Sequence, residues 1–123
     1  MSINVSVIIP IFNKAEHLGY CLESVFDQTL KSIEVICIND ASSDGSENIL
    51  RTFSKSEPRL RIIENSRNLG AAYSRNKGIA AANGEFLRFL DADDLLPLES
   101  TQMMYERAIE DDVDLVRGSL ALF

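Results

Sequence analysis

Three carboxylates stand close together in the sequence, at Asp91, Asp93 and Asp94. They follow directly after an apolar run, residues 86–90, that is typical of a strand. Like charges at one strand end repel one another, and a protein tolerates this mainly where a cation is bound. Two carboxylates, with substrate phosphates supplying further oxygens, suit Mg²⁺ or Mn²⁺. These aspartates are therefore candidate metal ligands.

A purely structural interpretation of the same segment is also open. An Asn-Gly pair at 83–84 is a turn signal, so residues 85–90 are predicted to form a buried strand. A proline opens the segment 97–110, which is predicted to be a helix because proline is favoured in a first helical turn. Asp94 would then only favour the start of that helix by its negative charge. An Asp-x-Asp pattern alone does not decide between the two.

Length and composition exclude several classes of function. The chain has 123 residues, 46% of them hydrophobic, which is enough for one soluble globular domain with a core. Its net charge of −7 argues against nucleic acid or an anionic membrane as a partner. Cys21 and Cys37 lie in apolar patterns without metal or redox spacing, so buried reduced thiols are predicted. With no signal peptide and no long apolar span in the sequence, a cytoplasmic location is expected.

The first predicted strand, residues 5–10, is a near-continuous apolar and β-branched run, as expected for a strand covered on both faces. Pro10 cannot donate to a strand ladder and should mark its end. Asn13 is predicted to cap the next helix, with Glu16 completing a capping box. The apolar face of this helix consists of Leu18, Cys21, Leu22, Val25 and Phe26.

A second buried strand is predicted at 33–39, and it runs into a second polar cluster. Asp40 stands directly at the strand's carboxyl end, too early to cap a helix, so a ligand-binding role is predicted for it. Asp44 is predicted to be the N-cap of the following helix. That helix is expected to turn three apolar residues inward, namely Ile49, Leu50 and Phe53.

The remaining segments continue the alternation of strands and helices. The third strand, at 60–64, is more polar and is expected near an edge. An alanine-rich helix is predicted over 70–83, and Arg75, one turn into it, is either a solvated arginine or a cation for a diphosphate or a base carbonyl. A last strand is predicted at 115–123. The residues expected to pack inward from the helices over 70–83 and 97–110 are Ala72, Ile79 and Ala80, and Met103, Met104 and Ile109.

Strands alternating with helices predict an α/β fold: a three-layer, open and mostly parallel twisted sheet with helices on both faces. The strand order is predicted to be third, second, first, fourth. Ligands of such sheets bind outside the carboxyl ends of strands at a topological switch point. One crevice should therefore collect Pro10, Ile11, Phe12, Asp40, Asp91 and Asp93.

Sequence signals argue against other α/β classes. No glycine-rich phosphate loop follows any strand, so a dinucleotide dehydrogenase, a P-loop phosphotransferase and a nucleotidyltransferase are disfavoured. A receiver-like signalling domain fits the length and the acids at strand ends. It should, however, carry paired acids after its first strand and a lysine after its fifth, where this chain has Asn13 and Arg117.

Three segments together resemble family-2 inverting glycosyltransferases of the Rossmann-like GT-A fold. They are VSVIIPIFNKAEHLGYCLESVFDQT from residue 5, INDASSDGS from residue 38, and NLGAAYSRNKGIAAANGEFLRFLDADD from residue 68. The resemblance implies transfer of a sugar, with inversion, from a nucleotide diphosphate sugar to an acceptor hydroxyl. It further implies a UDP-sugar donor, a glycan or lipid-linked acceptor, and a role in polysaccharide biosynthesis.

The resemblance also assigns roles to residues of this sequence. Asp91 and Asp93 match the DXD motif, with Asp93 expected to coordinate Mn²⁺ or Mg²⁺ directly and Asp91 to lie nearer the ribose and sugar. Asp40 matches the aspartate that contacts the nucleotide base, and Arg75 the arginine after the N-x-G loop that also approaches it. The residues that would flank the base are Pro10, Ile11 and Phe12.

The family's general base and acceptor-binding segments lie in a later portion of a longer catalytic domain. Residues 1–123 are therefore expected to be the nucleotide-sugar-binding portion of a truncated domain, with the catalytic residue unassigned. A fragment that binds the donor without turnover is the alternative. Arg88, inside the predicted fourth strand, is expected to pair with a carboxylate.

Overall fold

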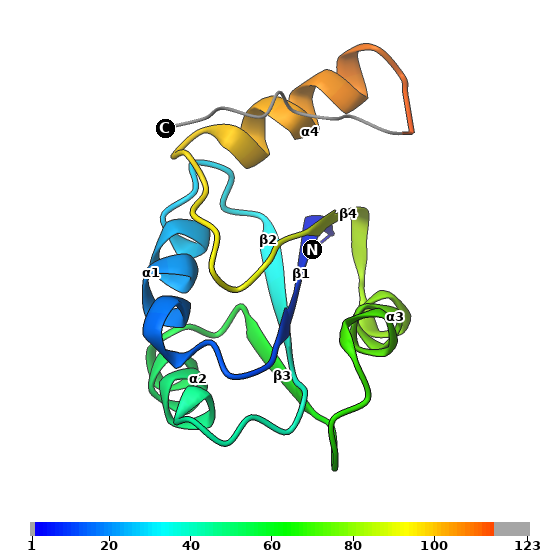
Figure 1. The fold of residues 1–123 in the computed structure, drawn as a ribbon. Coiled ribbons are helices and arrows are strands. Elements are labelled where there is room, and N and C mark those ends of the chain that lie inside the picture. The colour runs from blue at the N-terminus through cyan, green and yellow to red at the C-terminus, as the bar shows by residue number, and fades with distance from the viewer. Residues whose placement is uncertain (1, 115–123) are drawn as a thin grey trace.

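The computed structural model describes residues 2–114, and within them four strands form one sheet in the order β3-β2-β1-β4. Every pairing is parallel, so the predicted α/β class and strand order are confirmed (Figure 1). The order differs from the 2-1-3-4-5 order of receiver-like domains, which removes that alternative. The strands are β1 (Ile3–Ile11), β2 (Ile33–Asn39), β3 (Leu60–Glu64) and β4 (Gly84–Phe89).

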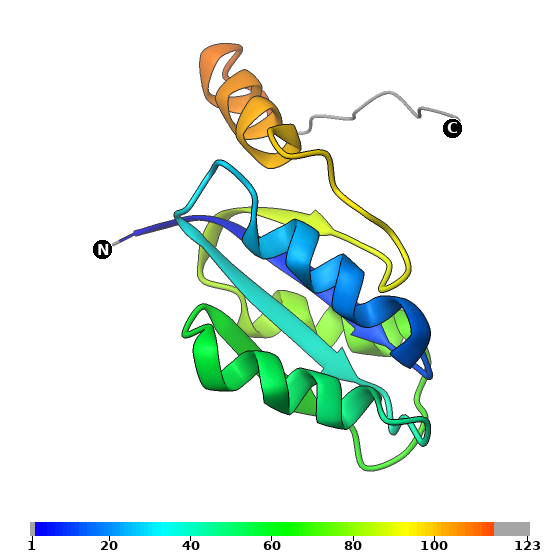
Figure 2. The ribbon, with the colours of Figure 1, turned by 90° about the vertical axis from the view of Figure 1, so that its left-hand side faces the viewer.

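Helices lie on both faces of the sheet, as predicted. Figures 1 and 2 show α1 and α2 on one face and α3 on the other, with α4 at the top of both views, next to the edge of the sheet that β4 forms. The expected three-layer arrangement is therefore confirmed. The helices are α1 (Ala15–Phe26), α2 (Ser46–Ser56), α3 (Ala71–Ala81) and α4 (Ser100–Glu110).

The apolar residues of β1 and β2 form two cores, one on each face of the sheet. The larger core joins alternate residues of β1 and β2 to the predicted apolar faces of α1 and α2. The smaller core, under α3, is built on Ile8, Ile36 and Ile38. Because both faces are covered, every residue of β2 is buried, whereas β3 at the edge is only partly buried. Cys21 and Cys37 are buried free thiols, as predicted.

The packing face predicted for α3 is wrong. Ala72, Ile79 and Ala80 are exposed, and Ser74 and Gly78 are buried instead. A Cβ atom on Gly78 would lie 2.5 Å from Cγ2 of Ile8, so the absent side chain lets the helix approach the sheet closely. Alanines occur on every side of this helix, so apolar spacing could not identify the buried face.

β4 is more exposed than its apolar sequence predicted. It is an edge strand of the described sheet, and the side chains on the α3 side of it remain accessible, with Leu87 exposed to 42% and Phe89 to 48%. The opposite side of β4 packs on α4, where the rings of Phe86 and Tyr105 meet edge to face, 5.9 Å between centroids.

α4 begins at Ser100, three residues later than Pro97, so the predicted helix start is wrong. Its inward residues are Thr101 and Ala108, while Met103 is exposed to 64% and Ile109 to 50%. The strand predicted at 115–123 lies outside the described residues. In the part of the chain that the structure describes, none of the helices combines the length and apolarity needed to cross a bilayer.

Candidate functional site

A pocket of about 350 Å³ opens at the carboxyl ends of the central strands. It is formed by the end of β1, the end of β2, the first turn of α3 and the loop after β4. The predicted meeting of these strand ends in one crevice is therefore confirmed. The side chains that line the pocket come from Pro10, Ile11, Phe12, Lys14, Asp40, Ala71, Ser74, Asp91, Ala92 and Asp93.

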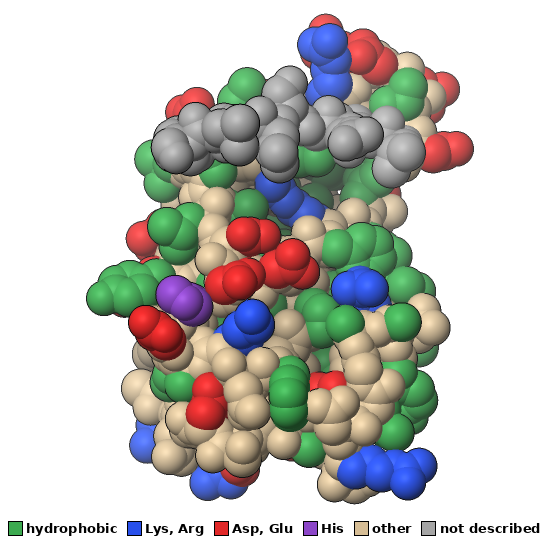
Figure 3. All heavy atoms as spheres, viewed as in Figure 1, with side chains coloured by type: hydrophobic (Ala, Val, Ile, Leu, Met, Phe, Trp, Pro, Cys, Tyr) green, Lys and Arg blue, Asp and Glu red, His purple; other side chains and the backbone are tan. Residues whose placement is uncertain are grey.

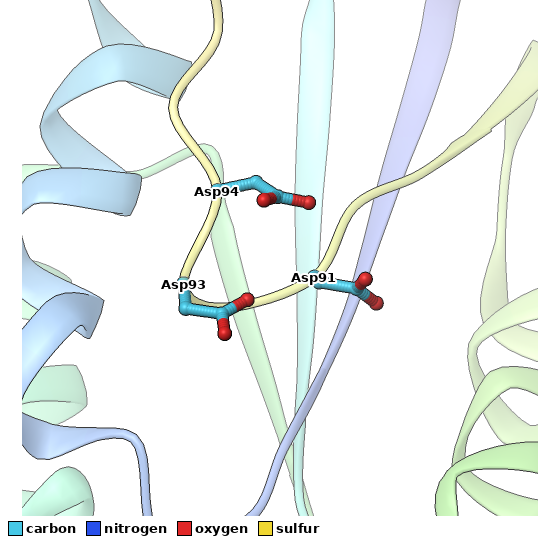
Figure 4. Close-up of side chains that lie close together, drawn as sticks. All are labelled: Asp91, Asp93 and Asp94. Atoms are coloured by element: carbon cyan, nitrogen blue, oxygen red, sulfur yellow. The ribbon is translucent and has the colours of Figure 1, made fainter. Parts of the chain in front are cut away.

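The loop after β4, which we call the acidic loop (residues 90–99), carries three exposed carboxylates. One oxygen each from Asp91, Asp93 and Asp94 can be chosen so that all lie within 4.8 Å of one another. Figure 4 shows the three side chains lying close together along the loop, and Figure 3 shows acidic side chains gathered at the middle of this face. Hard oxygen donors at this spacing fit Mg²⁺ or Mn²⁺.

Electrostatics around the acidic loop favour a bound cation. Partial burial raises the pKa of Asp94, and the negative charges of Asp91 and Asp93 raise it further. The only described amine at the cluster is that of Lys14, whose Nζ lies 3.5 Å from Oδ2 of Asp93. The repulsion that the sequence predicted among these aspartates is therefore present in the fold and only partly offset.

Asp40, for which a ligand-binding role is predicted, is almost fully buried at 3% exposed. Its Oδ1 accepts hydrogen bonds from the backbone N–H of Leu69 and from Nδ2 of Asn65, both at 2.8 Å, and its Oδ2 accepts one from the N–H of Gly70 at 2.9 Å. Burial alone would raise the pKa of this carboxyl group, but the three hydrogen bonds outweigh burial and lower it. Asp40 thus ties β2 to the loop that precedes α3.

The helix caps next to the pocket differ from the prediction. α1 begins at Ala15, and Asn13, predicted to cap it, has a left-handed φ of 52° and accepts a hydrogen bond from the N–H of Ser43. Asp44 stands one residue before the N-cap of α2, yet its Oδ1 accepts a hydrogen bond from the N–H of Ser46. Its Oδ2 accepts another from the N–H of Ala15. One aspartate thus serves the first turns of two helices.

The two arginines singled out in the sequence lie outside this pocket. Arg75 lines a neighbouring hollow between α3 and the exposed ring of Phe89. Arg88 was expected to pair with a carboxylate, and that expectation is wrong, because its guanidinium donates to the hydroxyl oxygens of Thr101 and Ser100. Partial burial lowers the pKa of Arg88.

Lys14 is the pocket residue that sequence reasoning missed. It lines the cavity and contacts Asp93. A chain of net charge −7 needs a local cation to hold a phosphorylated ligand, and a lysine directly after the first strand loop was the available signal.

A parallel sheet with an acidic loop at a pocket on its carboxyl edge is the arrangement in which open α/β proteins bind ligands. The chain matches the family model described as "Glycosyl transferase family 2" over residues 6–122, and it belongs to that family. The family membership predicted from three sequence segments is therefore confirmed.

Known proteins have related sequences and a similar fold. The chain is 34% identical to glycosyltransferase GlyG of Streptococcus pneumoniae, covering 97% of this chain and 40% of that protein. TarS of S. aureus, solved in complex with UDP, superposes with a TM-score of 0.81 at 26% identity, covering 88% of this chain and 32% of TarS. Mannosyltransferase PcManGT of Pyrobaculum calidifontis, in complex with GDP-Man and Mn²⁺, gives 0.75 at 28% identity, covering 83% and 31%. The chain thus spans well under half the length of these proteins.

Proposed function

We propose that this chain is the donor-binding part of a glycosyltransferase that uses a nucleotide diphosphate sugar, with a UDP-sugar as the first candidate. The observation that carries this proposal is the pocket itself. It brings together side chains from three strand ends. The family resemblance assigns nucleotide and metal roles to several of these residues, Asp40, Asp91 and Asp93 among them. The structural relatives add support, because TarS has been solved with UDP and with UDP-GlcNAc, and PcManGT with GDP-Man.

In this proposal the nucleotide base lies against the end of β1. Pro10, Ile11 and Phe12 supply apolar surface for it, and the ring of Phe12 is 44% exposed. Asp40 lines the same pocket, and an ionised carboxylate has about four acceptor positions. Three are taken by Asn65, Leu69 and Gly70, which leaves one on Oδ2 for an N–H group of a base. Arg75 would reach the base from the neighbouring hollow.

Asp93 would coordinate Mn²⁺ or Mg²⁺ directly, and Asp91 would lie on the ribose and sugar side. Such an ion, when bound, offsets charge that develops on the diphosphate leaving group. The acidic loop and Lys14 would hold the diphosphate end of the donor at the pocket mouth.

The proposed reaction is a single displacement at the anomeric carbon. The acceptor hydroxyl oxygen forms a bond to that carbon from the side opposite the diphosphate, and the bond to the diphosphate oxygen breaks. The configuration inverts, the nucleoside diphosphate departs, and the hydroxyl proton passes to a general base. We assign that base, and the site for a glycan or lipid-linked acceptor, to the part of the relatives' length that this chain does not span.

A titration tests this proposal. The chain is titrated by calorimetry with UDP, GDP and their sugar derivatives, with and without Mn²⁺. Mn²⁺-dependent binding of one nucleotide is the expected result, and no binding of any nucleotide would contradict it. Adding acceptor sugars to the same samples should release no nucleoside diphosphate, because the proposal assigns the general base to a part of the relatives that this chain does not span. Release of nucleoside diphosphate would contradict that assignment.

A further inference from the structure

A stripe of three side chains, two on α1 and one just after it, faces the acidic loop. Cys21 and Ser24 lie three residues apart on one side of α1, and Gln28 follows two residues after the helix ends at Phe26. In Figure 1 the yellow segment after β4 runs beside α1, and hydrogen bonds join the two. The loop from 90 to 99 has no regular secondary structure of its own, so these contacts decide its course.

Gln28 makes the most extensive of these contacts. The residue is 0% exposed, although its side chain is polar. Its Nε2 donates to the carbonyl oxygen of Pro97 at 2.8 Å and to that of Ser24 at 3.1 Å. Its Oε1 accepts from the backbone N–H of Thr101 at 2.9 Å. One amide group therefore holds both the end of the acidic loop and the first turn of α4.

Ser24 and Cys21 hold the loop nearer to the carboxylates. The Ser24 hydroxyl accepts a hydrogen bond from the backbone N–H of Leu96 at 3.1 Å and donates to the carbonyl oxygen of Cys21 at 2.7 Å. The Cys21 thiol donates to the carbonyl oxygen of Asp91 at 3.7 Å.

Removing these hydrogen bonds would change the positions of the three carboxylates of the acidic loop. Asp91, Asp93 and Asp94 repel one another, so a loop free to move would spread them apart. A metal site binds well when a surrounding shell fixes its ligands before the ion arrives. The stripe supplies such a shell through the backbone, without touching the ion.

We propose that Gln28, with Ser24, is a positioning residue that holds the acidic loop in the geometry that binds the divalent ion. This inference rests on the proposed function, since it assumes that the loop is a metal site. It concerns Ser24 on α1 and Gln28 just after that helix, neither of which lines the pocket.

The test compares Gln28→Met and Ser24→Ala with Ile36→Ala. Ile36 is buried in the smaller core on the opposite face of the sheet, so its loss lowers stability without touching the loop. Mn²⁺ alone is the probe, and its binding is followed by the decrease of the electron paramagnetic resonance signal of free Mn²⁺. Hydrogen exchange of the Leu96 and Thr101 amides reports the loop directly in the metal-free chain.

The expected result is that Gln28→Met and Ser24→Ala bind Mn²⁺ about tenfold or more weakly, as losses of outer-shell partners usually do. The Leu96 and Thr101 amides should exchange faster in these variants. Ile36→Ala should melt at a lower temperature but keep wild-type Mn²⁺ affinity and wild-type exchange at both amides.

Folded variants that bind Mn²⁺ like wild type and keep slow exchange would overturn the inference. If Gln28→Met does not fold, Ser24→Ala decides by the same two measurements. If wild type itself binds no Mn²⁺, the metal part of the proposed function fails. The exchange data then still show whether the stripe orders the loop, so the two failures are distinguishable.

Discussion

The backbone N–H of Gly70 donates a 2.9 Å hydrogen bond to Oδ2 of Asp40. This contact joins the carboxyl end of β2 to the start of α3, so a residue assigned to the ligand also supports the fold. Asp40→Ala should therefore lower the free energy of unfolding by about 1–3 kcal/mol, because buried N–H groups lose their acceptor. The exposed Asp27→Ala serves as a matched control in urea unfolding. Equal stability of the Asp40 variant and wild type would refute this role.

The contribution of Asp40 should also depend on pH. Its folded pKa is lowered from the ordinary value of 3.8, so the unfolded chain binds its proton first as pH falls. The stabilisation is present above 3.8 and is lost as pH falls through the lower folded pKa. Thermal melts of wild type and Asp40→Asn should differ most near neutrality and converge in acid. A gap that stays constant or widens in acid would contradict the assignment.

Lys14 and a metal ion should compete for Asp93. Removing the amine in Lys14→Met should tighten Mn²⁺ binding about two- to fivefold, since a half-exposed ion pair contributes little more than that. The same change should weaken binding of UDP in the presence of Mn²⁺, because the pocket loses the positive charge of the lysine. Lys55→Met, on the exposed side of α2, is the control. Weaker binding of Mn²⁺ alone would show that Lys14 does not compete.

Arg75→Ala should weaken binding of UDP while leaving the melting temperature within error, because the side chain lines an open hollow. Arg107→Ala removes the same charge from exposed α4, where the arginine pairs with Asp111, and should leave UDP binding unchanged. Calorimetric titration measures both variants. Unchanged binding in Arg75→Ala would mean that the arginine does not approach the base.

Much of the fold could be predicted because β1 and β2 are apolar on both faces. In addition, apolar runs typical of strands alternate along the chain with segments whose apolar residues have helical spacing. Parallel strands alone predicted that Asp40 and Asp91 would line the same pocket. The buried face of α3 could not be predicted, since it depends on a missing Cβ at Gly78 and not on hydrophobicity.

Side-chain partners across long sequence distances were also beyond the sequence. Nothing near Asp40 indicated that its acceptors would be used by Leu69 and Gly70, about 30 residues later, since only the fold brings that loop to the end of β2. Gln28 appeared to be an ordinary polar residue at a helix end. Its role depends on Pro97 and Thr101, which only the folded chain brings near it.

The central claim, that Asp93 helps to hold a metal and a nucleotide diphosphate, is tested most directly by thermal melts of wild type and Asp93→Ala with UDP, with and without Mn²⁺. Ligand bound only to the folded state raises the midpoint. Wild type should show an upward shift that requires Mn²⁺, and the unliganded variant should melt at the same or a slightly higher temperature, because repulsion among the carboxylates is relieved. The variant should show no Mn²⁺-dependent shift. A variant that melts lower than wild type and keeps the full shift would contradict the claim.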